Sequence, residues 1–409
     1  MLGDAPQAAI RTKLTSVLRR LWWGLALGVL VLQSPPPLAQ APPAEIAAIE
    51  GVQTGREGEL ATLTLEQAMK RTGVPGMTLA VIRNFELQWT RAYGLADVVS
   101  HAATTPETLF QAASISKPIT AMAILKAVSD KRFTLDDDVN KVLASWKVPP
   151  SEHTVKQPVT LRGLLSHTSG TDDGFGFPGY KPGAPIPTLP QILNGEAPSN
   201  VGRVLVGRPP LIAFKYSGGG LTLAQLLLTD AVKRPFPDIM REWVLTPVGM
   251  SHSVYEQPLS PDRDKNAARA HDRSGAARDV KWHVYPELAA AGLWTTASDL
   301  ARFGIEMQKS LQGRSNRVLS REIMSEMATP VGVGPFGLGV QITKQGEGWY
   351  LSHSGSNWGF QCLLIVHKLK GYGLAVMTNS DSGGRLLSEM QQRVAAAYQW
   401  DSLDKPLRR

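Results

Sequence analysis

Apolar residues recur with two different spacings along this chain. Short apolar runs, several with a period of two, predict β-strands, and they cover residues 77–82, 87–93, 336–343, 349–353, 360–367 and 372–378. Longer stretches of helix-forming residues predict helices at 64–71, 119–128, 134–143, 221–232, 238–244, 298–311 and 386–398. Strands are therefore expected near both ends of the chain, with most of the helices between them.

This order of elements predicts an α+β fold. We expect an antiparallel sheet built from both chain ends and flanked by helices, with an inserted, mainly helical domain. The predicted boundaries are a linker at 42–57, a sheet domain at 58–105 and 312–400, a helical domain at 106–311, and a tail at 401–409. Residues 171–210 are rich in glycine and proline, so we expect a long loop that forms a wall or lid of a cleft between the domains.

The first 41 residues have the pattern of an export signal. Basic residues, among them Arg19 and Arg20, precede an apolar run of 12 residues at 21–32, and a small-x-small site follows at 38–41. The run is short for a membrane span. We therefore expect a periplasmic or secreted protein without a stable membrane span after signal removal. An uncleaved anchor is the alternative.

The net charge of the chain bears on whether it binds nucleic acid. Cleavage after Ala41 would remove four basic residues and Asp4, which lowers the formal net charge from +8 to +5. This mild excess of positive charge comes without a basic helix or aromatic-basic alternation, so no nucleic-acid partner is predicted.

The single cysteine, Cys362, cannot form an internal disulfide and is expected in the core. The chain contains no metal-ligand spacing such as His-Glu-x-x-His, so neither a metal nor another cofactor is expected.

The strongest candidate for chemistry is Ser114-Ile115-Ser116-Lys117, at the start of a predicted helix. A serine and a lysine three residues apart share one helix face. A neutral amine beside a hydroxyl can take its proton and create a nucleophile. The free N–H groups and the positive dipole at a helix start stabilise an oxyanion. A second Ser-x-x-Lys, at 402–405, lies in the polar tail and lacks such a setting.

Two further clusters of candidate active-site residues follow along the chain. Tyr216-Ser217-Gly218 precedes a helical run, and His353-Ser354-Gly355 lies between strand-like runs. Together with Ser114-x-x-Lys117, this order resembles the serine β-lactamase and penicillin-binding-protein superfamily, in particular its class C-like branch, which includes β-lactamase-type carboxylesterases. Residues 164–170 and 379–384 are also similar to stretches of that family. The resemblance covers about residues 58–400 and implies a β-lactamase/transpeptidase-like fold.

The resemblance implies a role for each motif residue. Ser114 would be the nucleophile, and Lys117 and Tyr216 would transfer its proton; which of the two is the general base stays open. Burial would lower the pKa of Lys117, and a nearby lysine cation would give Tyr216 phenolate character. The backbone N–H groups of Ser114 and Ser356 would form the oxyanion hole. Gly355 would let substrate approach the strand closely.

Two departures from the family pattern bear on the substrate. The third motif begins with His353 where lysine is usual, and histidine is mostly neutral at pH 7. The second motif ends in Gly218 where asparagine is usual, so no side-chain amide is available to hold an acylamino group. Both changes weaken recognition of amides that carry a carboxylate, and they favour an ester. Ser354, Gly355 and Trp358 are expected beside the substrate as well, Trp358 in the acyl pocket.

The other histidines are not expected to be catalytic. We expect His167 to be structural and to hold a loop, whereas His271 or His283 could line the cleft.

The predicted function is that of an exported serine hydrolase, which acts through a Ser114 acyl-enzyme on carboxylic esters or related acyl substrates. A β-lactamase or D-amino-acid peptidase is the alternative within the same chemistry, with a β-lactam or a cell-wall peptide as substrate. A slowly deacylating penicillin-binding module is an alternative of another class. The oligomeric state is not predicted.

Overall fold

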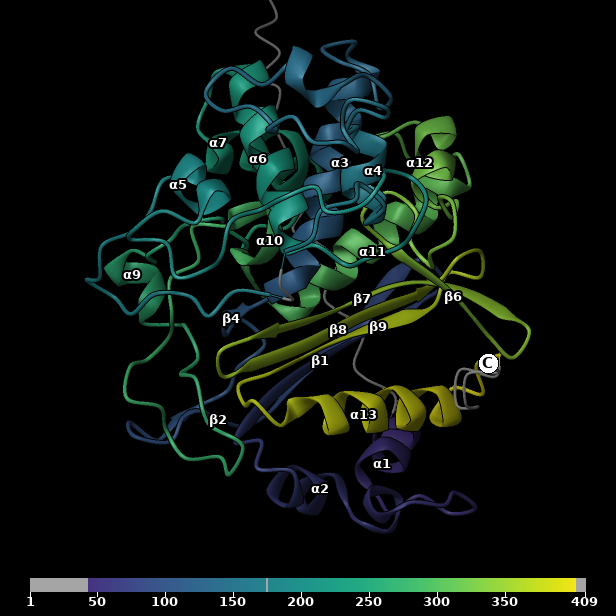
Figure 1. The fold of residues 1–409 in the computed structure, drawn as a ribbon. Helices are drawn as coiled ribbons and strands as arrows, with labels where there is room; N and C mark the ends of the chain where they lie inside the picture. Colours follow the sequence, from purple (N-terminus) through teal and green to yellow (C-terminus); the bar gives the residue numbers. More distant parts are fainter. Residues whose placement is uncertain (1–42, 174–175, 402–409) are drawn as a thin grey trace, which may run out of the picture. The chain divides into compact units, whose positions relative to one another are not determined.

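A seven-stranded antiparallel sheet is the central layer of the computed structural model, which describes residues 43–173 and 176–401. The strand order is β3-β2-β1-β9-β8-β7-β6, so strands from the two chain ends meet where β1 pairs with β9 (Figure 1). The bounds are β1 (Gly76–Arg83), β2 (Glu86–Asp97), β3 (Ala102–Ala103), β6 (Gln341–Gln345), β7 (Gly348–Asn357), β8 (Phe360–His367) and β9 (Gly373–Thr378). The predicted α+β class, with a sheet from both ends, is confirmed.

Helices cover both faces of this sheet. They are α1 (Pro43–Glu50), α2 (Leu65–Arg71), α3 (Ser116–Ser129), α4 (Leu161–Ser166), α5 (Leu189–Asn194), α6 (Gly218–Val232), α7 (Phe236–Met240), α8 (Thr246–Val248), α9 (Pro261–Asp264), α10 (Leu288–Ala291), α11 (Ala297–Leu311), α12 (Arg321–Met327) and α13 (Gly383–Ala397). A separate two-stranded sheet pairs β4 (Phe110–Gln111) with β5 (Trp294–Thr295). The short 3-10 turn η2 (Ala113–Ile115) leads from β4 into α3.

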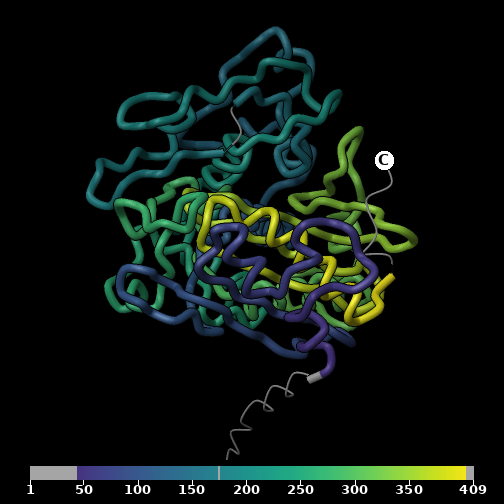
Figure 2. Tube along the Cα trace, turned by 90° about the horizontal axis from the view of Figure 1, so that it is seen from below, coloured from purple at the N-terminus to yellow at the C-terminus, as the bar shows by residue number. Residues whose placement is uncertain are grey.

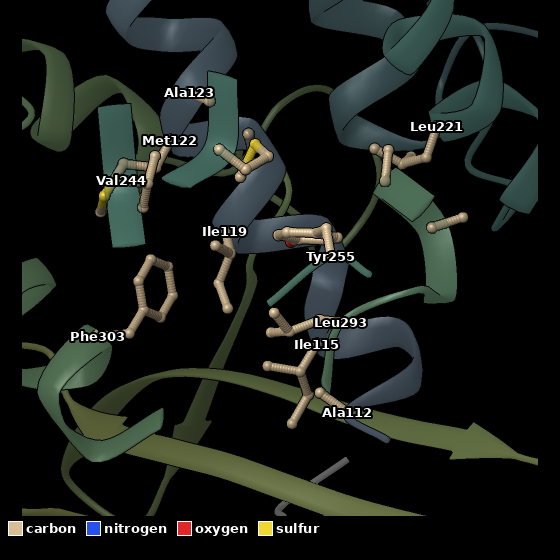
Figure 3. Packing of buried hydrophobic residues seen from close by; sticks show 14 of the residues in the cluster. Ala112, Ile115, Ile119, Met122, Ala123, Leu221, Val244, Tyr255, Leu293 and Phe303 are labelled. Atoms are coloured by element: carbon tan, nitrogen blue, oxygen red, sulfur yellow. The ribbon is translucent and has the colours of Figure 1, made fainter. Parts of the chain in front are cut away.

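Side chains alternate between two apolar cores along the central strands, as a period of two requires. Ala80, Ile82, Ala375 and Met377 join the larger core, which also contains residues of α3, α6 and α11. Leu79, Val81, Leu374 and Val376 face the other way, into a smaller core with α2 and α13. Figure 3 shows part of the larger core around Ile119 and Phe303, with Ala112 and Ile115 close to the strands. The turn that carries Ser114 is thus anchored on this side of the sheet.

The boundary predicted at residue 311 would assign α11 to the helical domain, but in the structure α11 lies on the sheet. α11 packs against β1, β9, β2 and β8. A side chain at Gly304 would lie only 2.7 Å from Val366 of β8, so this glycine lets the helix approach the sheet closely. The helix is amphipathic and turns Leu300, Phe303 and Met307 toward the sheet's core.

The predicted linker at 42–57 is wrong for its described residues. They contain α1, whose Ile46 and Ile49 lie three residues apart and are both buried. Viewed from below, the N-terminal segments lie over α13 (Figure 2). The buried guanidinium of Arg393 on α13 donates to the carbonyls of Ile49 and Gly51 at 3.0 Å and of Leu60 and Leu63 at 2.7 Å. The segment is therefore part of the folded layer.

The helix predicted at 134–143 is also wrong, since only a 3-10 turn, Val139–Lys141, forms there. Thr134 and Asp138 accept hydrogen bonds from the backbone N–H groups of Asp137 and Asn140. Such local bonds offer the backbone an alternative to the helix. The apolar residues at 135, 139 and 143 are buried, which explains the helix-like spacing.

Some predictions fall outside the described residues. These are the signal peptide at 1–41 and residues 402–409 of the tail, including the second Ser-x-x-Lys. Within the ranges 43–173 and 176–401, no helix combines the length and apolar character that crossing a bilayer requires.

Candidate active site

Ser114 lies in η2, directly before α3, as predicted. It is half-buried, whereas its neighbours from 110 to 113 and from 115 to 120 are all buried. The preceding Ala113 has a φ of 48°, a left-handed conformation that is uncommon for alanine. Strained backbone of this kind gathers at functional sites, where the surrounding structure holds it. The turn thereby presents one hydroxyl at the edge of the core.

Lys117 extends from the first turn of α3 to the Ser114 hydroxyl. Its Nζ lies 2.9 Å from Ser114 Oγ and donates to the carbonyl of Ala290, on α10, at 2.7 Å. Burial lowers the pKa of Lys117 to about 7, although the nearby charge of Asp173 acts in the opposite direction. A large fraction of this amine is therefore neutral at pH 7 and able to accept a proton.

Tyr216 precedes the first turn of α6, and its hydroxyl forms a hydrogen bond with Ser114. Lys117 Nζ lies 5.1 Å from the centre of its ring. Burial nevertheless raises the pKa of Tyr216 above its ordinary value, so the predicted phenolate character is wrong. The physical reason is that burial disfavours the phenolate and also reduces the charge of the neighbouring lysine. Tyr216 is thus a neutral phenol that can donate or relay a proton.

His167 is structural, as predicted, and supports Tyr216. Its Nδ1 accepts the N–H of Ser217 at 3.2 Å, and its ring lies 4.3 Å from the ring of Tyr216. His271 is buried and bonded to the carbonyl of Asn379 at 2.9 Å, so it also holds two loops together.

His353 is buried on β7, and its protonation follows from its contacts. Nδ1 lies 2.6 Å from the carbonyl of Ser354. Because a carbonyl only accepts, Nδ1 carries the hydrogen and Nε2 presents a lone pair. Nε2 has no hydrogen-bond partner in the described part of the chain. Burial, together with the charge of Lys117, lowers the pKa of His353 to about 3, so the third motif supplies no fixed cation at pH 7.

The second half of β7 has an open edge beside η2. β6 pairs with β7 only as far as Ser352, and β7 continues to Asn357, paired with β8. A two-residue turn joins Asn357 to its partner Phe360. Because Asn357 and Phe360 close the hairpin as a hydrogen-bonded pair, alternation of the ladder makes Ser356 and Gln361 a non-hydrogen-bonded pair. The Ser356 N–H therefore points away from β8, to the open edge. This is the orientation that the predicted oxyanion hole requires.

Gly355 has a packing role that was not predicted. A side chain there would lie 2.2 Å from the carbonyl oxygen of Ala112 and 2.5 Å from Cys362 Sγ. The glycine therefore makes room for the chain before Ser114. Its role in letting substrate approach the strand stays a prediction. Cys362 is buried in the core, as predicted; its thiol donates to Ala112 at 2.9 Å, and burial raises its pKa.

Two other predicted substrate contacts, Ser354 and Trp358, lie on β7 and directly after it, and their contact with substrate stays a prediction. Ser354 is exposed on the opposite face of β7 from Gly355, because successive side chains alternate along a strand. The ring of Trp358 stacks on His283 with centres 3.9 Å apart, and the Arg278 guanidinium lies 4.9 Å from its centre. Trp358 thus joins the end of β7 to the segment around His283.

Asp173 belongs to the site but was not predicted. Its carboxylate accepts hydrogen bonds from Ser217 Oγ and, at 2.8 Å, from the N–H of Gly219. It is also the charge that acts on Lys117. No motif in the sequence marks it, since an aspartate in a glycine-rich loop is common. Among the described residues, no group of histidine, cysteine, aspartate or glutamate side chains has the geometry of a metal site.

Comparisons with known proteins show the family of this chain. The Beta-lactamase family model matches residues 62–399. Protein flp of Staphylococcus aureus (strain MW2) is 24% identical over 332 residues, which cover 78% of this chain and 62% of that protein. The chain therefore spans less than two thirds of the length of this relative. Penicillin-binding protein 4 of Amycolatopsis lactamdurans is 26% identical over 75% of this chain and 81% of its own length.

Solved structures show the same fold. The octameric penicillin-binding protein homologue from Pyrococcus abyssi superposes with a TM-score of 0.67 at 23% identity, over 84% of this chain and 78% of that chain. The D-amino acid amidase from Ochrobactrum anthropi SV3 superposes with a TM-score of 0.64 at 22% identity, over 87% and 98% of the two chains.

Proposed function

Because this chain belongs to the Beta-lactamase family, we propose that it is a serine hydrolase that forms an acyl-enzyme at Ser114. One observation carries the proposal. Lys117 Nζ lies 2.9 Å from Ser114 Oγ, in surroundings that lower the lysine pKa to about 7. A hydroxyl beside a partly neutral, buried amine is an activated nucleophile.

The reaction follows from this geometry. Neutral Lys117 takes the Ser114 proton as Oγ attacks the carbonyl carbon, and the N–H groups of Ser114 and Ser356 stabilise the oxyanion. The Tyr216 phenol, bonded to Ser114, relays the proton to the leaving group. Water then attacks the acyl carbon, and its proton passes through Lys117 and Tyr216 to Ser114 Oγ. The bond between the acyl carbon and Oγ breaks, which releases the acid and restores the Ser114 hydroxyl.

For the substrate we propose carboxylic esters. The support is that His353 is neutral and that Gly218 has no side chain to hold an acylamino group. The neutral state of His353 removes the point charge that would hold a substrate carboxylate. The similarity to Penicillin-binding protein 4 and to the D-amino acid amidase supports the second candidate, a β-lactam or a D-amino-acid amide or peptide.

We also propose that the protein is exported to the periplasm or secreted. The pattern of residues 1–41 alone supports this. Cell fractionation with N-terminal sequencing of the mature protein tests it, and a cytoplasmic protein that retains residues 1–41 would contradict it.

The deciding experiment measures steady-state hydrolysis of a chromogenic butyrate ester and of a chromogenic cephalosporin by the purified protein and by Ser114→Ala. We expect ester turnover that Ser114→Ala abolishes, and little cephalosporin turnover. Fast cephalosporin turnover would make the protein a β-lactamase. A cephalosporin burst without turnover would indicate a binding module. Ester hydrolysis that survives Ser114→Ala would refute the acyl-enzyme.

A further inference from the structure

The first turn of α6, next to Tyr216, consists of three glycines at 218–220. Side chains of the preceding loop occupy the space that they leave. A Cβ on Gly218 would lie 2.7 Å from Cε2 and 2.9 Å from Cζ of Phe177, and one on Gly219 would lie 2.4 Å from Val204 Cγ2. The helix thus contributes only backbone at this point, and Phe177 and Val204 of the loop supply the side chains beside it.

The position of Phe177 is set by the residues that follow it. The N–H and C=O groups of Tyr180 pair with those of Val284 at 2.8 and 2.7 Å. The carbonyl of Pro178 accepts a hydrogen bond from Nδ1 of His283 at 2.9 Å. Gly179, with a φ of 72°, lies against the ring of Tyr285, where a side chain would come within 2.7 Å of Cζ. Hydrogen bonds and packing therefore fix the position of residues 177–180.

The same segment also connects to the strand that carries Ser356. His283 stacks on Trp358, and the Tyr285 hydroxyl accepts the Trp358 N–H at 3.0 Å. Phe177 thus lies in a wall that runs from Gly218, the first residue of α6, to the end of β7. Its ring is only partly buried and packs on the main core, so one part of it faces solvent.

We propose that Phe177 determines acyl specificity and that the site takes esters whose acyl chain is apolar next to the carbonyl. This rests on the serine hydrolase function proposed above. An aromatic ring gains from covering methylene groups. The same ring offers neither donor nor acceptor to an amide, so an acyl chain with an amide at this point loses hydrogen bonds to water without replacement.

Two nitrophenyl esters of equal chain length test the proposal: the pentanoate and the N-acetylglycinate. The measured quantity is the ratio of their kcat/KM values. Comparing this ratio between variants cancels the difference in intrinsic reactivity of the two esters. We expect Phe177→Asn to lower the pentanoate-to-acetylglycinate ratio about 10-fold relative to the natural protein, and Phe177→Leu to change it by less than about 3-fold.

The outcomes separate the two proposals. Turnover that depends on Ser114, with the same ratio in the natural protein and in Phe177→Asn, would overturn the role of Phe177 and leave the hydrolase intact. Hydrolysis of both esters that persists in Ser114→Ala would overturn the proposed function itself.

A double-mutant cycle tests the contact independently of catalysis. Gly218→Ala places its methyl group against the Phe177 ring, so we expect a lower melting temperature, and we expect Phe177→Ala to relieve that loss in the double variant. Additive melting shifts would show that the two residues do not touch and would overturn the proposal.

Discussion

At the scale of single residues, the protonation state of Lys117 decides whether Ser114 can lose its proton. Its amine is buried, lies 2.9 Å from Ser114 Oγ, and has a pKa lowered to about 7. The Tyr216 phenol remains protonated because burial raises its pKa. Of the two candidates that the sequence leaves open, the structure therefore favours Lys117 as the group that accepts the Ser114 proton.

A pH profile tests this assignment. Since the neutral amine is the reactive form, kcat/KM for a neutral ester should rise with pH and level off above about 7. Lys117→Arg keeps its charge and should lose at least about 100-fold in kcat/KM. Lys126→Arg, on the same helix, is the matched control and should change little. A flat profile between pH 5.5 and 9 would speak against Lys117 as the base.

A second buried ionisable group, Glu287, affects how the stability of the protein depends on pH. Glu287 precedes α10, is fully buried, and neither of its carboxyl oxygens has a hydrogen-bond partner among the described residues. Burial raises its pKa from 4.5 to about 7. The unfolded chain releases this proton near pH 4.5 and the folded chain only near 7, so stability falls as pH rises through this window.

Glu287→Gln should remove that dependence. We expect it to stabilise the protein by up to about 3 kcal/mol at pH 8 and to have little effect at pH 4.5, because 1.4 kcal/mol corresponds to one pKa unit. Urea unfolding at both pH values measures this, with the exposed Glu196→Gln as control. An equal effect of Glu287→Gln at both pH values would contradict the linkage.

Motif residues could be predicted from the sequence, whereas their neighbours from the loop could not. Ser114 and Lys117 are three apart, so helix geometry alone brings them together. Asp173 and Phe177 reach the site only because the glycines at 218–220 admit the loop. Nothing in the pattern of a loop reports which of its side chains touch a distant helix.

At the scale of elements, strands were easier to predict than short helices. β8 has the predicted bounds, 360–367, because its apolar run ends at a turn on both sides. The acidic segment 134–143 has helical spacing but folds as a turn, since its side chains bond the local backbone. The predicted strand at 336–343 begins only at Gln341.

The contact of β7 with η2 gives a sharp test at this scale. Gly355→Ala places a methyl group 2.2 Å from the Ala112 carbonyl, which is backbone and cannot rotate away. We expect a loss of about 1–3 kcal/mol in stability. Displacement of the Ser356 N–H from the oxyanion should lower kcat about 100-fold.

Thermal unfolding and ester kinetics measure both effects. Ser354→Ala, the adjacent and exposed position on β7, is the stability control and should shift the free energy of unfolding by less than about 0.5 kcal/mol. Full activity in Gly355→Ala would show that β7 and η2 tolerate separation and would remove Ser356 from the mechanism.

At the scale of the whole chain, the two ends support each other. The sequence predicted a sheet from both ends, but it did not predict that 43–57 would be folded, because the carbonyls that hold this segment carry no sequence signal. Arg393 binds two carbonyls of this segment, those of Ile49 and Gly51, and two that follow it, those of Leu60 and Leu63. Its Nε pairs with Glu389 at 2.7 Å. The described N-terminal segment and α13 therefore form one layer on the same face of the sheet.

Removing this guanidinium should loosen that layer. We expect Arg393→Met to cost about 3–5 kcal/mol, because it leaves four carbonyls without this donor and Glu389 with Arg56 as its remaining ion-pair partner. Arg385→Met, on the exposed side of the same helix, should cost less than about 1 kcal/mol. Guanidinium unfolding compares the two variants, and equal losses would show that Arg393 has no special role.

The single cysteine has a practical consequence for handling the molecule. Cys362 is fully buried with a raised pKa, so its thiol should react slowly with maleimides. An exposed thiol introduced by Ala48→Cys would then be the preferred attachment point for a surface. α1 packs with α13 on the face of the sheet opposite η2 and α3. A monolayer coupled through residue 48 should therefore hold every copy with Ser114 turned toward the bulk solution.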